Sequence, residues 1–170
     1  MNTENKKWWC AYGAEKEKAF VAVMKDAVGY SVVMNPEKVS NPYALDLLIN
    51  GATGDLKVQE TPFFTCGTKG HDPQYCVTFN HKDLIRYKKY GHDVEIFFWV
   101  NWIKLTDYGT TVNQMHRIYV TSIAGITAQI SSGSSPSHAY QRRVNDQLGN
   151  AKSSYLLDLR KMTLVKDLLS

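Results

Sequence analysis

Residues 44–59, ALDLLINGATGDLKVQ, contain two short segments in which apolar and polar residues alternate. Successive side chains of a β-strand point to opposite faces, so this alternation predicts two strands. The Asn50-Gly51 pair between them is a favoured turn for a hairpin with a two-residue loop. With this turn, Asp46 of the first strand lies directly opposite Asp55 of the second.

The two faces of this hairpin differ in chemistry. The apolar face consists of Leu45, Leu47, Ile49, Leu56 and Val58, and the polar face of Asp46, Asp55, Lys57 and Gln59. Like charges directly opposite each other destabilise a sheet, and a divalent cation between the two aspartates would remove that penalty. We therefore interpret the polar face as a metal site with a lysine beside it. The alternative is an ordinary amphipathic hairpin whose polar face lies in solvent, with Asp46 paired diagonally to Lys57.

The composition is that of one soluble globular domain. The chain has 170 residues, of which 44% are hydrophobic and 21% charged, which is enough material for a single core. Its net charge of +4 is compatible with a nucleic-acid partner without requiring one. The polar residues 1–7 are not followed by an apolar run, and no apolar run is long enough to span a bilayer. We expect a cytoplasmic protein that does not enter a membrane.

The rest of the chain predicts alternating helices and strands. Helices are expected at 14–28 and 81–89, strands at 30–34, 75–79, 93–101 and 117–123, and two helical pieces within 137–168. This order predicts an α/β fold with a central mixed sheet. We expect residues 1–130 to form the α/β core, and residues 131–170 to form a serine-rich linker and a C-terminal helical extension of the same domain.

Glu17 is a third carboxylate of interest, because it shares a helical stripe with apolar residues. Phe20, Val21 and Met24 follow it at offsets of three, four and seven, so the stripe is expected to pack on the sheet. An isolated carboxylate is costly there. Glu17 therefore either reaches the two aspartates or lies at the edge of the stripe, where it meets water or pairs with a lysine.

These residues resemble the PD-(D/E)xK nuclease superfamily, which includes restriction endonucleases and archaeal-type Holliday-junction resolvases. The resemblance covers residues 13–101 and rests on Gly13-x-x-x-Glu17, Asp46 and Asp55-x-Lys57-x-Gln59. Leu45 stands where many members have proline. The resemblance implies a restriction-endonuclease-like α-β-β-β-α-β core and a Mg²⁺-dependent endonuclease acting on DNA.

The resemblance also implies a role for each residue. The implied ligands of Mg²⁺ or Mn²⁺ are Asp46, Asp55 and the backbone carbonyl of Leu56, with Glu17 as a further candidate. Lys57 would orient or deprotonate the attacking water, or stabilise the transition state, and Gln59 would hold the water or the phosphate. The alternative function is a non-catalytic module on the same fold that binds nucleic acid or protein.

Basic residues outside the hairpin are candidates for contacts with a nucleic-acid backbone. They are Lys82, Arg86 and Lys89 on the middle helix and Arg142 and Arg143 in the C-terminal part. DNA is the expected partner, and RNA is left open. A homodimer is compatible with the resemblance, since many members cut two strands as dimers.

Four further residues are of types that bind zinc. Cys66, His71, Cys76 and His81 are spaced by five residues, whereas zinc-ligand pairs are usually separated by two to four. The alternative is two buried or loop thiols and two surface histidines.

Overall fold

The computed structural model describes residues 6–41, 43–139 and 153–169, with side chains from residue 11 onward. The helices are α1 (Lys6–Met24), α2 (His81–Tyr87) and α3 (Ile123–Ser131), and the short 3₁₀ helices are η1 (Pro36–Val39), η2 (Phe64–Lys69) and η3 (Leu159–Lys161). The strands are β1 (Val32–Met34), β2 (Leu47–Ile49), β3 (Ala52–Gln59), β4 (Cys76–Asn80), β5 (Glu95–Asn101), β6 (Thr106–Asp107), β7 (Thr110–Thr111), β8 (His116–Ser122), β9 (Ser137–Ala139), β10 (Ser153–Asp158) and β11 (Thr163–Asp167).

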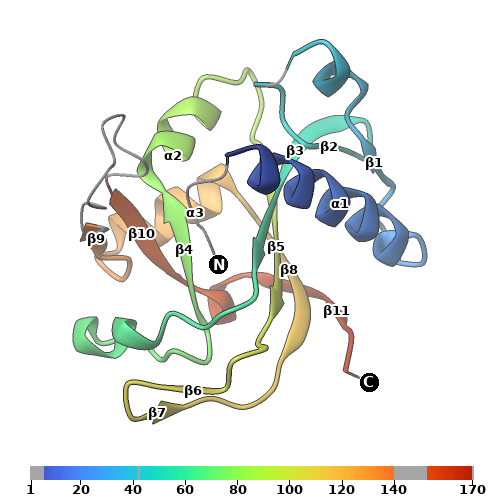
Figure 1. Cartoon of the computed structure of the whole chain (residues 1–170). Coiled ribbons are helices and arrows are strands. Elements are labelled where there is room, and N and C mark those ends of the chain that lie inside the picture. Colours follow the sequence, from blue (N-terminus) through green and yellow to red (C-terminus); the bar gives the residue numbers. More distant parts are fainter. Residues whose placement is uncertain (1–5, 42, 140–152, 170) are drawn as a thin grey trace.

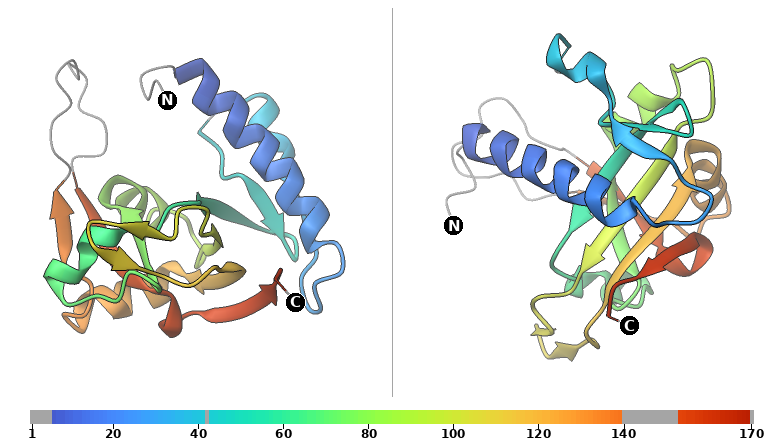
Figure 2. Two further views of the ribbon diagram at one scale, coloured as in Figure 1. Left: turned by 60° about the horizontal axis from the view of Figure 1, so that its bottom comes forward. Right: turned by 90° about the vertical axis from the view of Figure 1, so that its right-hand side faces the viewer.

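A six-stranded sheet of order β1-β2-β3-β5-β8-β11 forms the centre of the protein. β3 and β5 are parallel, and the other neighbouring strands of this sheet are antiparallel. Helix α1 crosses one face of the sheet, while α2, α3 and a second sheet of order β4-β10-β9 lie on the other (Figures 1 and 2). The expected α/β class with a central mixed sheet is confirmed.

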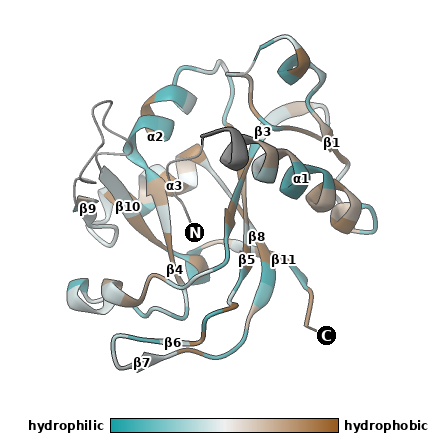
Figure 3. Ribbon diagram, viewed as in Figure 1, coloured by the Kyte–Doolittle hydropathy of each residue, from teal (hydrophilic) through white to brown (hydrophobic). Residues whose placement is uncertain are grey.

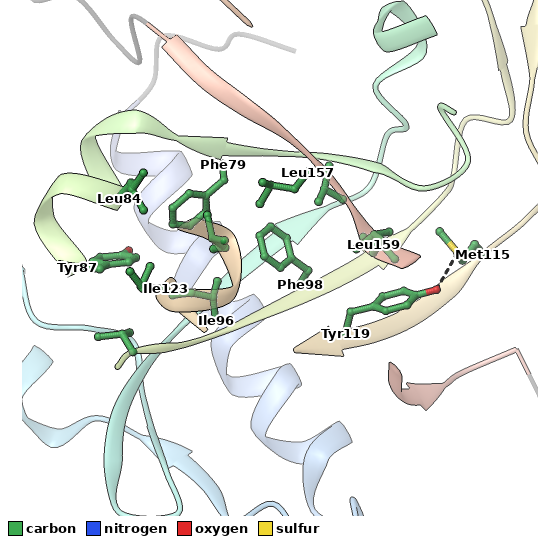
Figure 4. Close-up of a cluster of buried hydrophobic side chains, with 14 of the residues drawn as sticks. Phe79, Leu84, Tyr87, Ile96, Phe98, Met115, Tyr119, Ile123, Leu157 and Leu159 are labelled. Atoms are coloured by element: carbon green, nitrogen blue, oxygen red, sulfur yellow. Dashed lines mark hydrogen bonds between the residues drawn. The ribbon is translucent and has the colours of Figure 1, made fainter. Parts of the chain in front are cut away.

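Strand β5 is shared by the two apolar clusters that cover the faces of the central sheet. Its Phe97 packs against Phe20 of α1, with ring centroids 5.2 Å apart. Its Ile96 and Phe98 belong to the larger cluster under α2 and α3, part of which is drawn in Figure 4. A strand buried on both faces needs a near-continuous apolar sequence, which explains the hydrophobic run of β5. Figure 3 shows the contrast with α2, most of which is hydrophilic.

The hairpin of β2 and β3 has the predicted turn. Asn50 and Gly51 both have positive φ, 50° and 87°, as a type I′ turn requires. The register pairs Leu47 with Gly54, so one step further along Asp46 faces Asp55, as predicted. Leu45 differs from the prediction: it packs in the cluster under α2, because β2 begins only at Leu47 and the chain before it does not continue the alternation.

Helix α1 is longer at its N-terminus than the sequence indicated. It begins at Lys6, so Gly13 lies inside the helix, where a glycine costs only about 1 kcal/mol relative to alanine. Phe20 and Met24 are buried as predicted. The helix was predicted to continue to residue 28, but it ends at Met24, and Val28 is 96% exposed.

Where the structure describes the C-terminal part, the predicted helical extension is wrong, and residues 140–152 of that prediction lie outside the described residues. The described part forms strands: β10 is the middle strand of the second sheet, and β11 joins the edge of the central sheet. Leu156 and Leu157 of β10 are both buried, in different clusters on its two faces. Consecutive apolar residues here reflect burial on both faces of a strand rather than one face of a helix.

The serine-rich segment also differs from the expected linker. Residues 123–131 before it form α3, which is capped by the Ser122 side chain accepting a hydrogen bond from the Gly125 amide at 3.1 Å. Within the segment, Ser135 is buried. The predicted strand at 75–79 exists as β4, but it pairs with β10 and not with the central sheet.

Among the residues that the structure describes, no helix is both long and apolar enough to cross a membrane.

We expect Gly54→Ala to lower the free energy of unfolding by about 1–3 kcal/mol, the usual cost of overpacking. An added Cβ would overlap the Ile49 side chain and lie 2.9 Å from the backbone oxygen of Glu95 on β5. Gly13→Ala is the matched control, because a Cβ there meets nothing within 4 Å. It should stabilise the protein by about 0.5–1 kcal/mol. Urea unfolding curves measure both, and destabilisation by Gly13→Ala would contradict the interior position of Gly13 in α1.

Candidate active site

Asp55 and Lys57 project from β3 toward α2, on the face of the central sheet that carries the larger apolar cluster. Lys57 Nζ lies 2.6 Å from Asp55 Oδ2 and 2.8 Å from Asp83 Oδ2 of α2. Asp55 is only 2% exposed, so the polar face of the hairpin does not lie in solvent. The alternative interpretation paired Asp46 diagonally with Lys57, whereas in the structure Lys57 pairs with Asp55 and Asp83.

Tyr87 of α2 completes the surroundings of Asp55. Its ring lies in the larger apolar cluster beside Leu84 and Ile123 (Figure 4), and its hydroxyl donates to Asp55 Oδ2 at 2.7 Å. Arg86 Nη2 donates to the same hydroxyl at 2.6 Å. Burial first, and then the charge of Asp55, raise the pKa of Tyr87, so the hydroxyl keeps its proton and remains a donor to Asp55.

Asp46 lies next to Asp55 but is held by a different lysine. Lys38 of η1 places its Nζ 2.5 Å from Asp46 Oδ1 and 2.7 Å from Glu17 Oε1 of α1. The other oxygen of Asp46 accepts a longer hydrogen bond, 3.4 Å, from the backbone amide of Leu56. The sequence left two alternatives for Glu17, and the structure shows pairing with a lysine, one that also binds Asp46.

The charges of this cluster explain the ionisation of its two aspartates. The cluster contains four carboxylates and three cations, counted over its ion pairs within the described residues. Burial and the neighbouring charge of Asp55 raise the pKa of Asp46 to about 7. Burial alone would raise the pKa of Asp55 as well, but the charge of Lys57 outweighs it and lowers that pKa. As the pH falls, Asp46 therefore takes up a proton before Asp55, which stays ionised.

Lys57 stays protonated in these surroundings. Burial would lower its pKa, but the negative charge of Asp55 outweighs burial and raises the pKa well above its usual value. The side chain is thus a fixed positive charge between two carboxylates. It also lies over the ring of Tyr87, 5.4 Å from the centroid.

The carboxylate oxygens of Asp46 and Asp55 are of the type that binds a divalent cation, although the site offers few of them. When Asp46 is ionised, the four carboxylates of the cluster outnumber its three cations, and a bound Mg²⁺ or Mn²⁺ would relieve this excess of negative charge; carboxylates are the ligands these ions prefer. Within residues 11–41, 43–139 and 153–169, no three His, Cys, Asp or Glu side chains are grouped as a ready-made metal site. These ranges include Cys66, His71, Cys76 and His81, and these four residues do not form a zinc site.

The residues of the zinc hypothesis have other contacts. Cys66 and Cys76 are buried free thiols, and a hydrogen bond between them lowers the pKa of Cys66. The Cys66 thiol also contacts the backbone oxygen of His71 at 3.7 Å. His81 packs edge-on against Tyr155, with ring centroids 5.5 Å apart.

Gln59 lies on the same face of β3 but is turned toward the neighbouring loop. Its Nε2 donates to the Thr61 backbone oxygen at 2.9 Å, and its Oε1 accepts from the Thr78 amide at 3.2 Å. Gln59 and Lys57 line one cavity of about 420 Å³, together with Thr78 and Asn80. The cavity opens beside the lysine that binds Asp55.

The structure brings only some of the basic residues predicted to contact a nucleic-acid backbone close to the site. Lys82 lies on α2 and Lys89 two residues after it, and both are exposed. Arg86 is bound to the site through Tyr87 and lies 3.5 Å from Asp83 Oδ1. Arg142 and Arg143 lie outside the described residues.

Sequence reasoning missed Lys38, Asp83 and Tyr87. No local pattern marks Lys38, because it reaches Asp46 from a separate turn. A signal for the other two was present: Asp83 and Tyr87 are four apart on one helix, and so on one helical face. That face could be assigned to the site only once α2 was known to pack over β3.

Comparison with known proteins gives little to add. No family model matches the chain, and no curated protein matches it in sequence. Among solved structures, D212, a nuclease from a fusselovirus, is similar over 96% of this chain and 88% of that chain, with a TM-score of 0.43 and 10% sequence identity.

The pKa of Asp46 predicts a pH dependence of stability in buffer with EDTA. The folded state binds this proton up to about pH 7, whereas the unfolded chain releases it near pH 4. Between these values the folded state holds more protons, so the free energy of unfolding falls as the pH rises. Asp46→Asn should flatten that slope, and the exposed control Asp26→Asn should keep it. Urea titrations from pH 4 to 8 measure the slopes, and parallel slopes for Asp46→Asn and wild type would contradict the assignment.

Tyr87→Phe should lower the free energy of unfolding by about 1–3 kcal/mol, since it leaves the buried Asp55 carboxylate without one donor. Tyr90→Phe is the control, because Tyr90 is only half-buried and lies at the edge of the same cluster. Guanidinium unfolding measures both. A Tyr87→Phe variant as stable as Tyr90→Phe would show that the hydroxyl does not hold Asp55.

Proposed function

We propose that this protein is a metal-dependent endonuclease that hydrolyses phosphodiester bonds in DNA, of the PD-(D/E)xK type. One observation supports this most directly: Asp46 faces Asp55 across the hairpin, and Lys57, two residues further along β3, places Nζ 2.6 Å from Asp55. Two adjacent carboxylates with a fixed ammonium beside them are suited to the chemistry of a phosphodiester.

In this proposal Asp46 and Asp55 hold Mg²⁺ or Mn²⁺, with the Leu56 backbone carbonyl and Glu17 as further ligands. Both aspartates offer hard oxygen donors, and their charges are not fully balanced by the neighbouring lysines. When bound, such an ion neutralises charge on the phosphate and lowers the pKa of a water molecule.

Lys57 is proposed to stabilise negative charge rather than to remove a proton. Its raised pKa keeps the ammonium charged at neutral pH, so it can donate hydrogen bonds to a phosphoryl oxygen or orient the attacking water. In the reaction, a water oxygen bonds to phosphorus and loses a proton, while one bridging P–O bond breaks and its oxygen gains a proton. Asp83 and Tyr87 position Lys57 and Asp55 for this step.

The substrate surface is proposed to extend from the site along α2. The cavity beside Lys57 is lined by Gln59 and Asn80, which offer hydrogen-bonding groups to a phosphate or sugar. Lys82 and Lys89 supply positive charge for contacts with a backbone, and Arg142 and Arg143 stay candidates from the sequence. A homodimer and a cytoplasmic location likewise remain predictions.

Cleavage of supercoiled plasmid and of a four-way DNA junction, each with Mg²⁺, Mn²⁺ or EDTA, tests the proposal. Wild type should cut with either metal and not in EDTA. Asp55→Asn and Lys57→Met should each lower the rate by about 100-fold or more, because each removes one charge from the reacting centre. Lys25→Met is the matched control on an exposed position and should cut like wild type.

Circular dichroism of each variant separates loss of activity from loss of folding. Cutting that persists in an Asp46→Asn/Asp55→Asn double variant would refute the site. Retarded migration of DNA in a gel without any cutting would favour the non-catalytic binding module. A single-stranded RNA substrate in the same assay decides between DNA and RNA.

A further inference from the structure

Lys38 lies where two of the candidate metal ligands meet. Its Nζ is 2.5 Å from Asp46 Oδ1 and 2.7 Å from Glu17 Oε1, so one ammonium joins an aspartate at the start of β2 to a glutamate of α1. Glu17 and Asp46 belong to segments that are far apart in the sequence. The Lys38 ammonium bridges the carboxylates of these two segments.

The two lysines of the site are held very differently. Lys57 extends from the middle of the central sheet and has Asp55, Asp83 and Tyr87 as partners. Lys38 extends from η1, a single 3₁₀ turn without a buried residue, although the two lysine side chains are exposed to the same extent, 24% for Lys38 and 25% for Lys57. Asn35, just before the turn, is the anchored residue: its amide donates to the Leu45 backbone oxygen at 2.8 Å. A rotation of the Lys38 side chain can thus take Nζ to solvent without moving the core.

We propose that Lys38 is an internal counter-ion that occupies the divalent-cation position between Glu17 and Asp46 and leaves it when the ion binds. This inference rests on the proposed function, because it concerns the metal of that site. It makes Lys38 a positioning residue that competes with the metal, in addition to the ligands themselves.

Two physical arguments support this competition. The oxygens that Lys38 contacts are the ones a cation would need, and an ammonium and a metal ion cannot occupy the same place. The Lys38 ammonium and a metal ion are also both positive, and two such charges in neighbouring positions repel each other strongly where the surroundings are only partly hydrated. Lysine suits such a role, since its ammonium is a compact charge on a flexible chain. Glu17 and Asp46 are consequently paired with a cation in both states: with the Lys38 ammonium before the metal binds and with the metal afterwards.

The test is Mn²⁺ binding to the full chain, measured by isothermal titration calorimetry, with melting temperatures recorded in EDTA and in Mn²⁺. Lys38→Met should bind Mn²⁺ about tenfold or more tightly than wild type. It should also melt lower than wild type in EDTA and gain more from Mn²⁺, because the two carboxylates then lose the ammonium that pairs with both of them. Lys38→Arg keeps the charge and Lys18→Met removes an exposed lysine next to Glu17, so both should bind Mn²⁺ like wild type.

A purely structural role for Lys38 would lower the melting temperature of Lys38→Met without tightening Mn²⁺ binding, and that result overturns the inference. If Lys38→Met does not fold, Lys38→Gln gives the same comparison with a polar, uncharged side chain. The proposed function fails separately: Mn²⁺ binding by wild type that Asp46→Asn leaves unchanged would refute the metal site itself. Binding that depends on Asp46 but is equal in wild type and Lys38→Met would refute only the role of Lys38.

Discussion

An ionised Asp55 carboxylate lies in the interior of this protein, and the arrangement of the site follows from what keeps it there. Its Oδ2 atom is bound by Lys57 Nζ at 2.6 Å and by the Tyr87 hydroxyl at 2.7 Å. Breaking a buried pair by removing one partner is strongly destabilising, because the remaining charge is left without compensation. Helix α2 is thus held to β3 by polar contacts as well as by the apolar packing of Leu84 and Tyr87.

The buried charge has a consequence for its neighbour. Asp46 faces Asp55 across the hairpin, and two carboxylates at that distance do not both ionise easily. Burial and the charge of Asp55 together raise the pKa of Asp46, even though Lys38 binds one of its oxygens. Asp55 is buried and bound by Lys57 and Tyr87, whereas Asp46 is bound by Lys38, which extends from η1, a turn without a buried residue. This asymmetry gives the pair one member that stays charged and one that takes up a proton near neutral pH.

The two-sided central sheet explains where the sequence predictions were right and wrong. Strand β5 was predicted because the apolar, aromatic-rich run Ile96–Val100 has no helical period and indicates a buried strand. The tail, with Leu156 and Leu157 adjacent, shows a similar pattern in a shorter segment, and was assigned to a helix. A short apolar run has the same appearance in a buried strand and in a helix, so periodicity could not distinguish them.

The sequence by itself determined the hairpin and its polar face. Asn50 and Gly51 can both adopt positive φ, and this turn sets the register that brings Asp46 opposite Asp55, while the alternation along β3 keeps Lys57 on the same face as Asp55. These are local properties of a few consecutive residues. Only the tertiary structure decided that Lys57 is held by Asp83 and Tyr87, and that Lys38 joins Glu17 to Asp46. These contacts join segments 8 to 30 residues apart, and their partners are set by how α1, η1 and α2 pack around the sheet, which no local pattern records.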